Sequence, residues 1–258
     1  MIKYYGYILC EFIEKYNISH IIKDSKTGEY IKDVSFENML YVVSKNFDFG
    51  WIALVALFAC AVFGYLIGSI NVAVIISKLC YRDDVRLHGS GNAGATNMLR
   101  TYGTKAGIAT FILDGIKGAV AVVLSMLLMG EGGAYIAGLF CILGHIFPVY
   151  YKFRGGKGVV VSAVTILALN PVVFLILVVI FVLIVATSKY ISLGSIVCAF
   201  FYPLLLNALS QNKGGLGPLA ATISVLIAVI VIVMHKSNIK RLINRRESKF
   251  SFKKKENK

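Results

Sequence analysis

Long apolar runs dominate this 258-residue sequence and limit the folds that it can adopt. Hydrophobic residues make up 57% of the chain and charged residues only 16%. The charges cluster between the runs, which excludes an ordinary soluble domain. Runs that are long enough, or nearly long enough, to cross a bilayer as a helix lie at 51–80, 106–130, 134–151, 158–170, 171–188, 191–209 and 216–234. The sequence therefore predicts an all-α integral membrane protein with seven transmembrane helices.

The fourth run is the weakest candidate for a span. Residues 158–170 are few for a crossing, and Pro171 is the only strong break before the next run. A single bent element over 158–188 is therefore an alternative. It would leave six spans and place both termini on the same side of the membrane.

Basic residues between the runs predict the orientation. Lysine and arginine gather after the first, third, fifth and seventh runs, whereas the other connections hold only Lys213. Because cytoplasmic loops carry an excess of these residues, we expect a cytoplasmic C-terminus and, with seven spans, an N-terminus outside. The expected parts are an outer extension of unassigned role over 1–50, a membrane domain over 51–247 and a basic cytoplasmic tail over 248–258.

The net charge of +14 could indicate nucleic-acid binding. Here, however, the excess lies on the cytoplasmic loops and the tail, where anionic membrane lipids are the nearer partner. We expect no nucleic-acid binding. The five cysteines form no CxxC pair and show no metal-ligand spacing with histidine, so neither a zinc site nor a disulfide framework is indicated. No metal and no cofactor are expected.

The most informative polar segment is Gly89-Ser-Gly-Asn-Ala-Gly-Ala-Thr-Asn-Met-Leu-Arg100, between the first two runs. Its glycines let backbone N–H groups approach an anion, and further donors come from the side chains of Ser90, Asn92, Thr96, Asn97 and Arg100. A phosphate group at a membrane surface is the expected guest. The segment also contains the G-x-G-x-x-G pattern of dinucleotide-binding folds, but no buried strand precedes it, which excludes that fold.

Further polar clusters lie at the predicted cytoplasmic ends of the runs. Around Lys157, Gly155, Gly156 and Gly158 are expected to expose backbone donors to a second phosphate site at the start of a helix. A plain basic turn would be the better interpretation of one such loop, but two on one face favour anion binding. The other clusters are Ser192-Leu-Gly-Ser195, His235 with Asn238 and Glu247, and the intramembrane pair Asp114 and Lys117, for which a structural salt bridge is an equal alternative.

Taken together, these motifs resemble the bacterial acyl-phosphate:glycerol-3-phosphate acyltransferases. The resemblance covers about residues 60–247 and rests on the segment 89–100, Asp114-Gly-Ile-Lys-Gly118, Gly144-His-Ile-Phe-Pro148, Gly155-Gly-Lys-Gly158, Ser192-Leu-Gly-Ser195 and His235-x-x-Asn238-Ile-x-Arg-Leu242. It implies a seven-helix enzyme of the bacterial plasma membrane, with its active site on the cytoplasmic face. The reaction would move a fatty acyl group from acyl phosphate to the 1-position of glycerol 3-phosphate, giving lysophosphatidic acid and phosphate for phospholipid synthesis. It would link the chain functionally to the enzyme that makes acyl phosphate.

The resemblance also assigns roles to residues of this sequence. The catalytic group would be Ser90, Arg100, Lys157, Ser195, His235 and Asn238. Substrate phosphate would be bound with the help of Gly89, Gly91, Asn92, Thr96, Asn97, Gly155, Gly156 and Gly158. Supporting residues would be Asp114, Lys117, His145 and Glu247. The family usually has a glycine two residues before the last glutamate, where this chain has Arg245, and the usual member has no counterpart of residues 1–50.

Two mechanisms fit these residues. The glycerol hydroxyl attacks the acyl carbonyl directly and the departing phosphate takes its proton, or His235 acts as a general base. A transporter of a phosphorylated small solute is the alternative function, since broken helices and anion-binding loops also suit it. That alternative predicts polar sites facing both sides of the membrane, whereas the polar motifs here are expected on one side.

Overall fold

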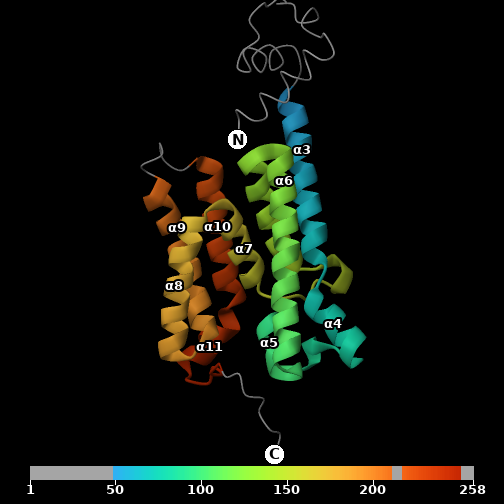
Figure 1. Ribbon diagram of the computed structural model, residues 1–258, viewed down its shortest axis with the longest axis vertical. Helices are drawn as coiled ribbons and strands as arrows, with labels where there is room; N and C mark the ends of the chain where they lie inside the picture. Colours follow the sequence, from blue (N-terminus) through green and yellow to red (C-terminus); the bar gives the residue numbers. More distant parts are fainter. Residues whose placement is uncertain (1–48, 211–216, 251–258) are drawn as a thin grey trace, which may run out of the picture. The chain divides into compact units, whose positions relative to one another are not determined.

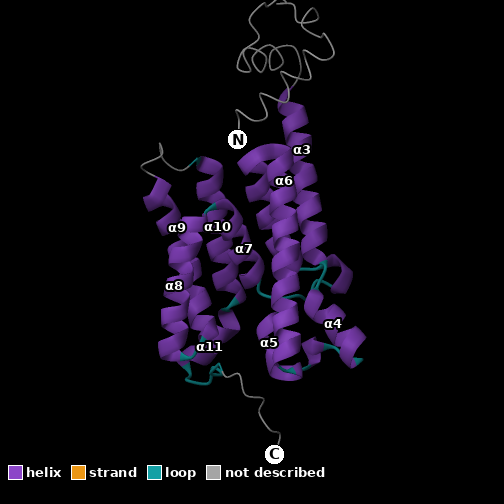
Figure 2. Ribbon diagram, in the orientation of Figure 1, coloured by secondary structure: helices purple, strands orange, loops and turns teal. Residues whose placement is uncertain are grey.

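The computed structural model describes residues 49–210 and 217–250, which form helices joined by loops (Figure 1). Figure 2 shows helices and loops only, and no strand occurs in these residues. The elements are α3 (Phe49–Ser69), α4 (Val72–Tyr81), η2 (Val85–Leu87), α5 (Ala95–Tyr102), α6 (Thr104–Ile146), η3 (Val149–Tyr151), α7 (Val159–Leu169), α8 (Pro171–Ser188), α9 (Ile191–Ser210), α10 (Pro218–Met234) and α11 (Lys236–Ile243). The predicted all-helical class is confirmed for the described residues.

The chain divides into two compact units, Met1–Ala56 and Leu57–Lys258. Of the first unit, the structure describes only the beginning of α3. The predicted extension 1–50 therefore lies almost wholly outside the described residues, as does most of the predicted tail. The candidate site described below belongs to the second unit.

Several described helices suit a bilayer by length and composition. Four stretches pass that test, Ala53–Tyr81, Thr104–Tyr151, Pro171–Ser188 and Ile191–Ser210, and α10 with α11 adds a fifth if this pair, bent by 55°, is one span. The 11 residues of α7 are apolar but short. Several membrane-spanning helices are thus supported, while seven crossings and their orientation stay a prediction.

Helix α6 folds back on itself. Lys117 Nζ lies 3.0 Å from His145 Nδ1 although the residues are 28 positions apart, and one straight helix would separate them by about 42 Å. The break lies at Met129 and Gly130, where Gly130 has φ of 62°, a backbone region that favours glycine. Figure 1 shows the two limbs of α6 joined by the turn at the top of the view. The limbs correspond to the predicted runs 106–130 and 134–151.

The chain also reverses between α7 and α8. Val159 and Val160 begin α7, and Phe181 lies ten residues into α8, yet all three line the same cavity. The chain moves about 16 Å along α7, and the first ten residues of α8 cover about 15 Å in the opposite direction, so Phe181 comes back to the level at which α7 begins. Residues 158–188 are therefore two helices that run in opposite directions, divided at Asn170 and Pro171.

Glycines allow α3 to pack closely against the second limb of α6. A Cβ atom on Gly68 would lie 2.2 Å from the carbonyl oxygen of Cys141, and one on Gly144 would lie 2.2 Å from the carbonyl oxygen of Tyr65. Such backbone contact requires residues without side chains and is typical of helix pairs in membranes. This packing holds the end of α6 that reaches the site.

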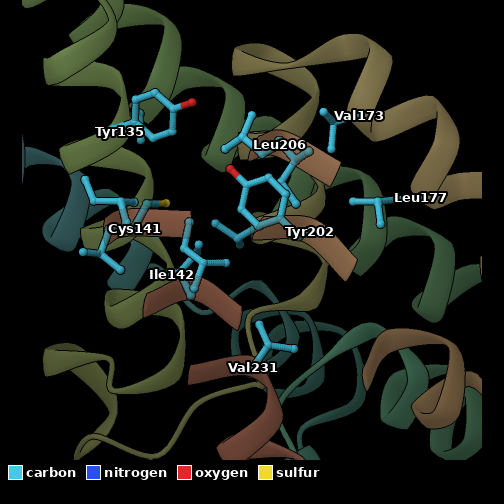
Figure 3. Packing of buried hydrophobic residues seen from close by; sticks show 14 of the residues in the cluster. Tyr135, Cys141, Ile142, Val173, Leu177, Tyr202, Leu206 and Val231 are labelled. Atoms are coloured by element: carbon cyan, nitrogen blue, oxygen red, sulfur yellow. The ribbon is translucent and has the colours of Figure 1, made fainter. Parts of the chain in front are cut away.

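Two buried apolar clusters support the fold. In the larger one, Tyr202 of α9 is completely buried between Ile142 of α6 and Leu177 of α8 (Figure 3). The smaller cluster includes Val74 of α4 and Met98 of α5 and packs beneath the connecting loops. The loops that carry the polar motifs thus rest on a packed base.

Candidate active site

A cavity of about 280 Å³ lies among the segments that carry the polar motifs. The predicted site residues that line it are Ser90, Asn92, Thr96, Asn97, Arg100, Asp114, His145, Lys157, Gly158, Ser195, His235, Asn238 and Glu247. The predicted residues outside its lining are Gly89, Gly91, Lys117, Gly155 and Gly156. The fold therefore brings together motifs that are separated by up to 157 positions in the sequence.

The buried amide of Asn97 holds the first loop in shape. Its Oδ1 accepts the Ser90 N–H at 3.0 Å, and its Nδ2 donates to the carbonyl oxygens of Val85 and His88, both at 3.0 Å. Gly89 has φ of 57°, and a Cβ there would lie 2.3 Å from Asn97 Oδ1. Although Asn97 lines the cavity, its amide is engaged by the loop itself, which suits positioning rather than phosphate binding.

The second loop differs from its prediction. The N–H groups of Gly155 and Gly156 do not face an anion, because they donate to the carbonyl oxygens of Ile146 and His145, both at 3.0 Å. The two glycines instead allow close packing: a Cβ on Gly155 would lie 2.0 Å from the His145 carbonyl oxygen. Gly158, with φ of 78°, turns the chain into α7. The prediction that Gly155 and Gly156 offer backbone N–H groups to an anion is therefore wrong. Lys157 does line the cavity, as expected.

The loops also bind each other. The Ala93 N–H donates to the Gly155 carbonyl oxygen at 3.3 Å, and Arg86 Nη1 donates to the Tyr151 carbonyl oxygen at 2.9 Å. Arg86 is itself paired with Asp84 at 2.6 Å. The two glycine-rich segments thus form one structural unit around the cavity.

A chain of hydrogen bonds organises the opposite wall. Lys157 Nζ donates to Asn238 Oδ1, and Asn238 Nδ2 donates to Glu247 Oε1 at 2.8 Å. Glu247 also accepts from Ser192 Oγ at 2.9 Å and from Arg241 Nε at 2.7 Å. Glu247 therefore fixes which end of the Asn238 amide faces Lys157.

Arg245 stands two residues before this glutamate, where the family usually has a glycine. Its φ is 53°, a left-handed conformation that favours glycine and costs other residues about 1–2 kcal/mol. The arginine adopts this conformation, and Glu247 still reaches its partners. The departure changes the local strain without displacing the carboxylate.

Burial and neighbouring groups shift the pKa values of Lys157 and Glu247 in this wall. Burial lowers the pKa of Lys157 to about 8, and the nearby Arg241 and Arg100 act in the same direction. Burial would raise the pKa of Glu247, but hydrogen bonds from Arg241, Asn238 and Ser192 outweigh it and hold that pKa below its usual value. Glu247 is thus ionised at neutral pH. Lys157 is mostly charged at pH 7 and loses its proton as the pH rises through about 8.

His235 presents one ring nitrogen to the cavity. Its Nδ1 lies 2.7 Å from the Val231 carbonyl oxygen. A carbonyl oxygen can only accept a hydrogen bond, so Nδ1 carries the proton. Nε2 is then left with its lone pair, which makes it an acceptor for a hydroxyl group. Ser195 Oγ donates to the Ile191 carbonyl oxygen at 3.0 Å within α9.

Asp114 and Lys117 form the expected pair, with 2.8 Å between Oδ1 and Nζ. Lys117 Nζ also donates to the carbonyl oxygens of Gly68 at 3.1 Å and Ile70 at 2.7 Å. These carbonyls lie at the end of α3, where a helix leaves acceptors without partners. The structural salt bridge is therefore present, and Lys117 joins α6 to α3.

Several residues of the site have no role among the predictions. Ser192 belongs to the motif Ser192-Leu-Gly-Ser195, and Arg241 lies one helical turn beyond Asn238. The structure shows that both donate to Glu247. Phe111 and Phe181 also line the cavity. They sit inside apolar runs, where no pattern distinguishes a cavity residue from one that faces lipid.

Comparisons with known proteins agree on one family. A model described as glycerol-3-phosphate acyltransferase matches residues 58–245. The chain is 42% identical over 188 residues to the glycerol-3-phosphate acyltransferase of Finegoldia magna, covering 72% of this chain and 91% of that protein. It is 44% identical over 189 residues to the enzyme of the same name from Thermoanaerobacter pseudethanolicus, covering 73% and 93%.

Solved structures give the same result. The chain is similar to the glycerol 3-phosphate form of PlsY, an integral membrane glycerol 3-phosphate acyltransferase, with a TM-score of 0.70 and 34% identity over 76% of this chain and 96% of that one. For the lysophosphatidic acid form the TM-score is 0.67 and the identity 33%, over 77% and 96%.

Proposed function

The chain belongs to the glycerol-3-phosphate acyltransferase family, and we infer from this that it is an integral membrane enzyme that acylates glycerol 3-phosphate to lysophosphatidic acid. The observation that carries this function is that the motifs resembling the family meet at one site: Arg100, Lys157 and His235 line the same cavity of about 280 Å³. The relatives are named as acyltransferases, so the transporter alternative is set aside.

We further propose acyl phosphate as the acyl donor. Both substrates would then carry phosphate, which agrees with a cavity lined by Arg100 and Lys157 and bordered by Arg241. Arginine can hold a phosphate through two parallel hydrogen bonds, whereas lysine acts as a point charge. An acyl phosphate already has a good leaving group, so positioning and charge stabilisation would supply most of the catalysis.

In the proposed reaction the 1-hydroxyl oxygen of glycerol 3-phosphate attacks the acyl carbonyl carbon. The new ester C–O bond forms, the C–O bond to phosphate breaks, and the hydroxyl proton leaves on phosphate. Arg100 and Lys157 would stabilise the charge that grows on the leaving group. His235 Nε2, as an acceptor, would orient the attacking hydroxyl.

The same lone pair of His235 also suits a general base, so the two mechanisms need a direct test. In His235→Gln the amide oxygen still accepts a hydrogen bond but cannot take a proton. Retention of most of the kcat, with a raised KM for glycerol 3-phosphate, supports substrate assistance. Near-complete loss of kcat at saturating substrate supports the general base.

We propose seven membrane crossings, the N-terminus outside, and the site on the cytoplasmic face of a bacterial plasma membrane. The fold-back of α6 and the reversal between α7 and α8 support the separate crossings, and the distribution of lysine and arginine supports the orientation. Residues 1–50, 51–247 and 248–258 would be the extension, the catalytic domain and the basic tail. Protease digestion of a C-terminal tag in sealed vesicles tests this: protection in right-side-out vesicles is expected, and digestion there would refute the orientation.

Anionic membrane lipids are the proposed partners of the basic loops and tail. The enzyme that makes acyl phosphate is the proposed functional partner, because its product would be consumed here. We propose no metal or organic cofactor for the reaction.

The donor assay uses purified protein in lipid or detergent with glycerol 3-phosphate. Acyl phosphate, acyl-CoA and acyl carrier protein are supplied in separate reactions, and lysophosphatidic acid and released phosphate are measured. Arg100→Ala and Lys157→Ala should lose most of the activity with acyl phosphate. Arg154→Ala is the matched control, because this exposed arginine lies on the second loop outside the cavity lining. Product from acyl-CoA alone, or unchanged rates in both site variants, would refute the proposed donor and site.

A further inference from the structure

His145 is a buried cavity residue that the chemistry above leaves without a role. It lies at the end of the second limb of α6, is 4% exposed and lines the cavity. Its Nδ1 lies 3.0 Å from Lys117 Nζ and 3.5 Å from Asp114 Oδ1. These distances decide where the proton of the imidazole sits.

The ammonium group of Lys117 fixes the tautomer. An ammonium has donors but no acceptor, so the contact at 3.0 Å requires a lone pair on His145 Nδ1. The alternative, an Nδ1–H donated to Asp114, is disfavoured by the longer distance of 3.5 Å. Lys117 is itself held by Asp114 at 2.8 Å. In the neutral ring the proton is therefore on Nε2.

Gly156 packs against the Nε2 end of the ring and leaves room for it, while His145 itself lines the cavity. A Cβ atom on Gly156 would lie 2.0 Å from His145 Nε2 and 2.9 Å from the Ala93 carbonyl oxygen. Any side chain at position 156 would thus cover or displace the imidazole. The glycine is required here because of the ring, since its own N–H already donates to the His145 carbonyl oxygen.

We propose that His145 donates its Nε2–H to an oxygen of the phosphate group bound in the cavity, with Asp114 and Lys117 as positioning residues that set the tautomer. His145 and His235 then form a complementary pair. His145 supplies a donor at Nε2, whereas His235 supplies an acceptor at Nε2. The inference rests on the proposed function in one respect, namely that the ligand bound in the cavity is a phosphate.

Two substitutions of His145 separate this role from a structural one. In His145→Gln the amide nitrogen reaches the place of Nε2 and keeps a donor toward the cavity. In His145→Asn the amide reaches only the place of Nδ1, so it keeps a partner for Lys117 and loses the donor. A phosphate donor predicts that the glutamine variant is the more active. A purely structural partner of Lys117 predicts the reverse order.

The kinetic readout is the KM for each substrate. Losing a hydrogen bond to a charged group should raise one KM by about 10- to 100-fold in His145→Asn, while His145→Gln keeps most of the wild-type kcat/KM. A rise in the KM for glycerol 3-phosphate assigns the contact to that phosphate, and a rise for acyl phosphate assigns it to the donor. Thermal unfolding of both variants checks that they fold. Equal KM values in folded His145→Asn and wild type would overturn the proposal.

A second readout needs no turnover. Nitrogen-15 spectra of histidine-labelled protein report which ring nitrogen carries the proton, and the chain has only four histidines. The His145 signals are identified by their loss in His145→Gln. A protonated Nε2 and unprotonated Nδ1, with Nε2 shifting when glycerol 3-phosphate or inorganic phosphate is added, supports the proposal. A protonated Nδ1 overturns it, even if the wild-type enzyme proves to use another acyl donor.

Discussion

The titration of Lys157 offers a sharp test of the site. Burial lowers its pKa to about 8 in the free protein, and lysine binds phosphate only in its charged form. Glycerol 3-phosphate is a dianion above pH 7, since the second pKa of such phosphates is about 6. Between pH 7 and pH 9, therefore, the lysine is the group whose charge is expected to change. We expect the KM for the substrate that it binds to rise over this range.

The magnitude follows from the pKa of about 8. A group with this pKa is about nine-tenths charged at pH 7 and about one-tenth charged at pH 9. If only the charged form binds the phosphate, KM rises about tenfold. Arg100 and Arg241 stay charged throughout, so binding weakens without being abolished.

Lys157→Arg is the matched variant, because arginine keeps its charge over the whole range. The assay measures the initial rate against substrate concentration at several pH values for both proteins. The wild-type KM should rise toward pH 9 while that of Lys157→Arg stays flat, whatever its absolute value. Equal pH profiles in the two proteins would refute the role of Lys157.

Unfolding does not produce the same profile. The folded-state pKa of Lys157 lies below its unfolded value of 10.5. Between about pH 8 and pH 10.5 the unfolded chain therefore binds the proton that the folded chain has lost, so this group makes stability rise with pH. A KM that rises while the thermal midpoint does not fall thus reports binding.

Substitutions at Arg245, Glu247 and Gly68 test the backbone strain, the hydrogen-bond network and the helix packing. Arg245→Gly should stabilise the protein by about 1 kcal/mol by removing a side chain from a left-handed conformation, and Arg245→Ala should give no such gain in thermal unfolding. Glu247→Ala should cost about 1–3 kcal/mol, because it leaves the buried Ser192 and Asn238 side chains without their acceptor; a fall of less than about 0.5 kcal/mol would contradict its organising role. Gly68→Ala should destabilise the protein by about 1–3 kcal/mol, because its Cβ would lie 2.2 Å from the Cys141 carbonyl oxygen. Gly115→Ala is the control and should be tolerated, because the nearest atom to its Cβ lies at 3.6 Å.

The sequence identified the site motifs but not always their roles. Ser90, Arg100, Lys157, His235 and Asn238 do line one cavity, as expected of motifs that share one ligand. The glycines at 155 and 156 were expected to offer N–H groups, yet these groups bond to the end of α6. A glycine can serve backbone approach to a ligand or close packing, and both uses look the same in a sequence.

Other assignments needed distances. The sequence left open whether Asp114 and Lys117 form a salt bridge, and the 2.8 Å contact settles that they do. It expected Glu247 only as a supporting residue, beside a position where Arg245 breaks the family pattern. The hydrogen bonds from Ser192, Asn238 and Arg241 show that the glutamate reaches its partners despite that change.

By itself the sequence determined the helical membrane character and the identity of the polar motifs. Both follow from local physics, since the cost of placing polar groups in a bilayer acts on each run separately and a glycine-rich turn is encoded by neighbouring residues. The tertiary structure decided which motifs meet. The bond between Lys157 and Asn238 spans 81 positions, and the fold-back of α6 brings His145 to Lys117. Such contacts depend on how all the helices pack together, and no local pattern carries that information.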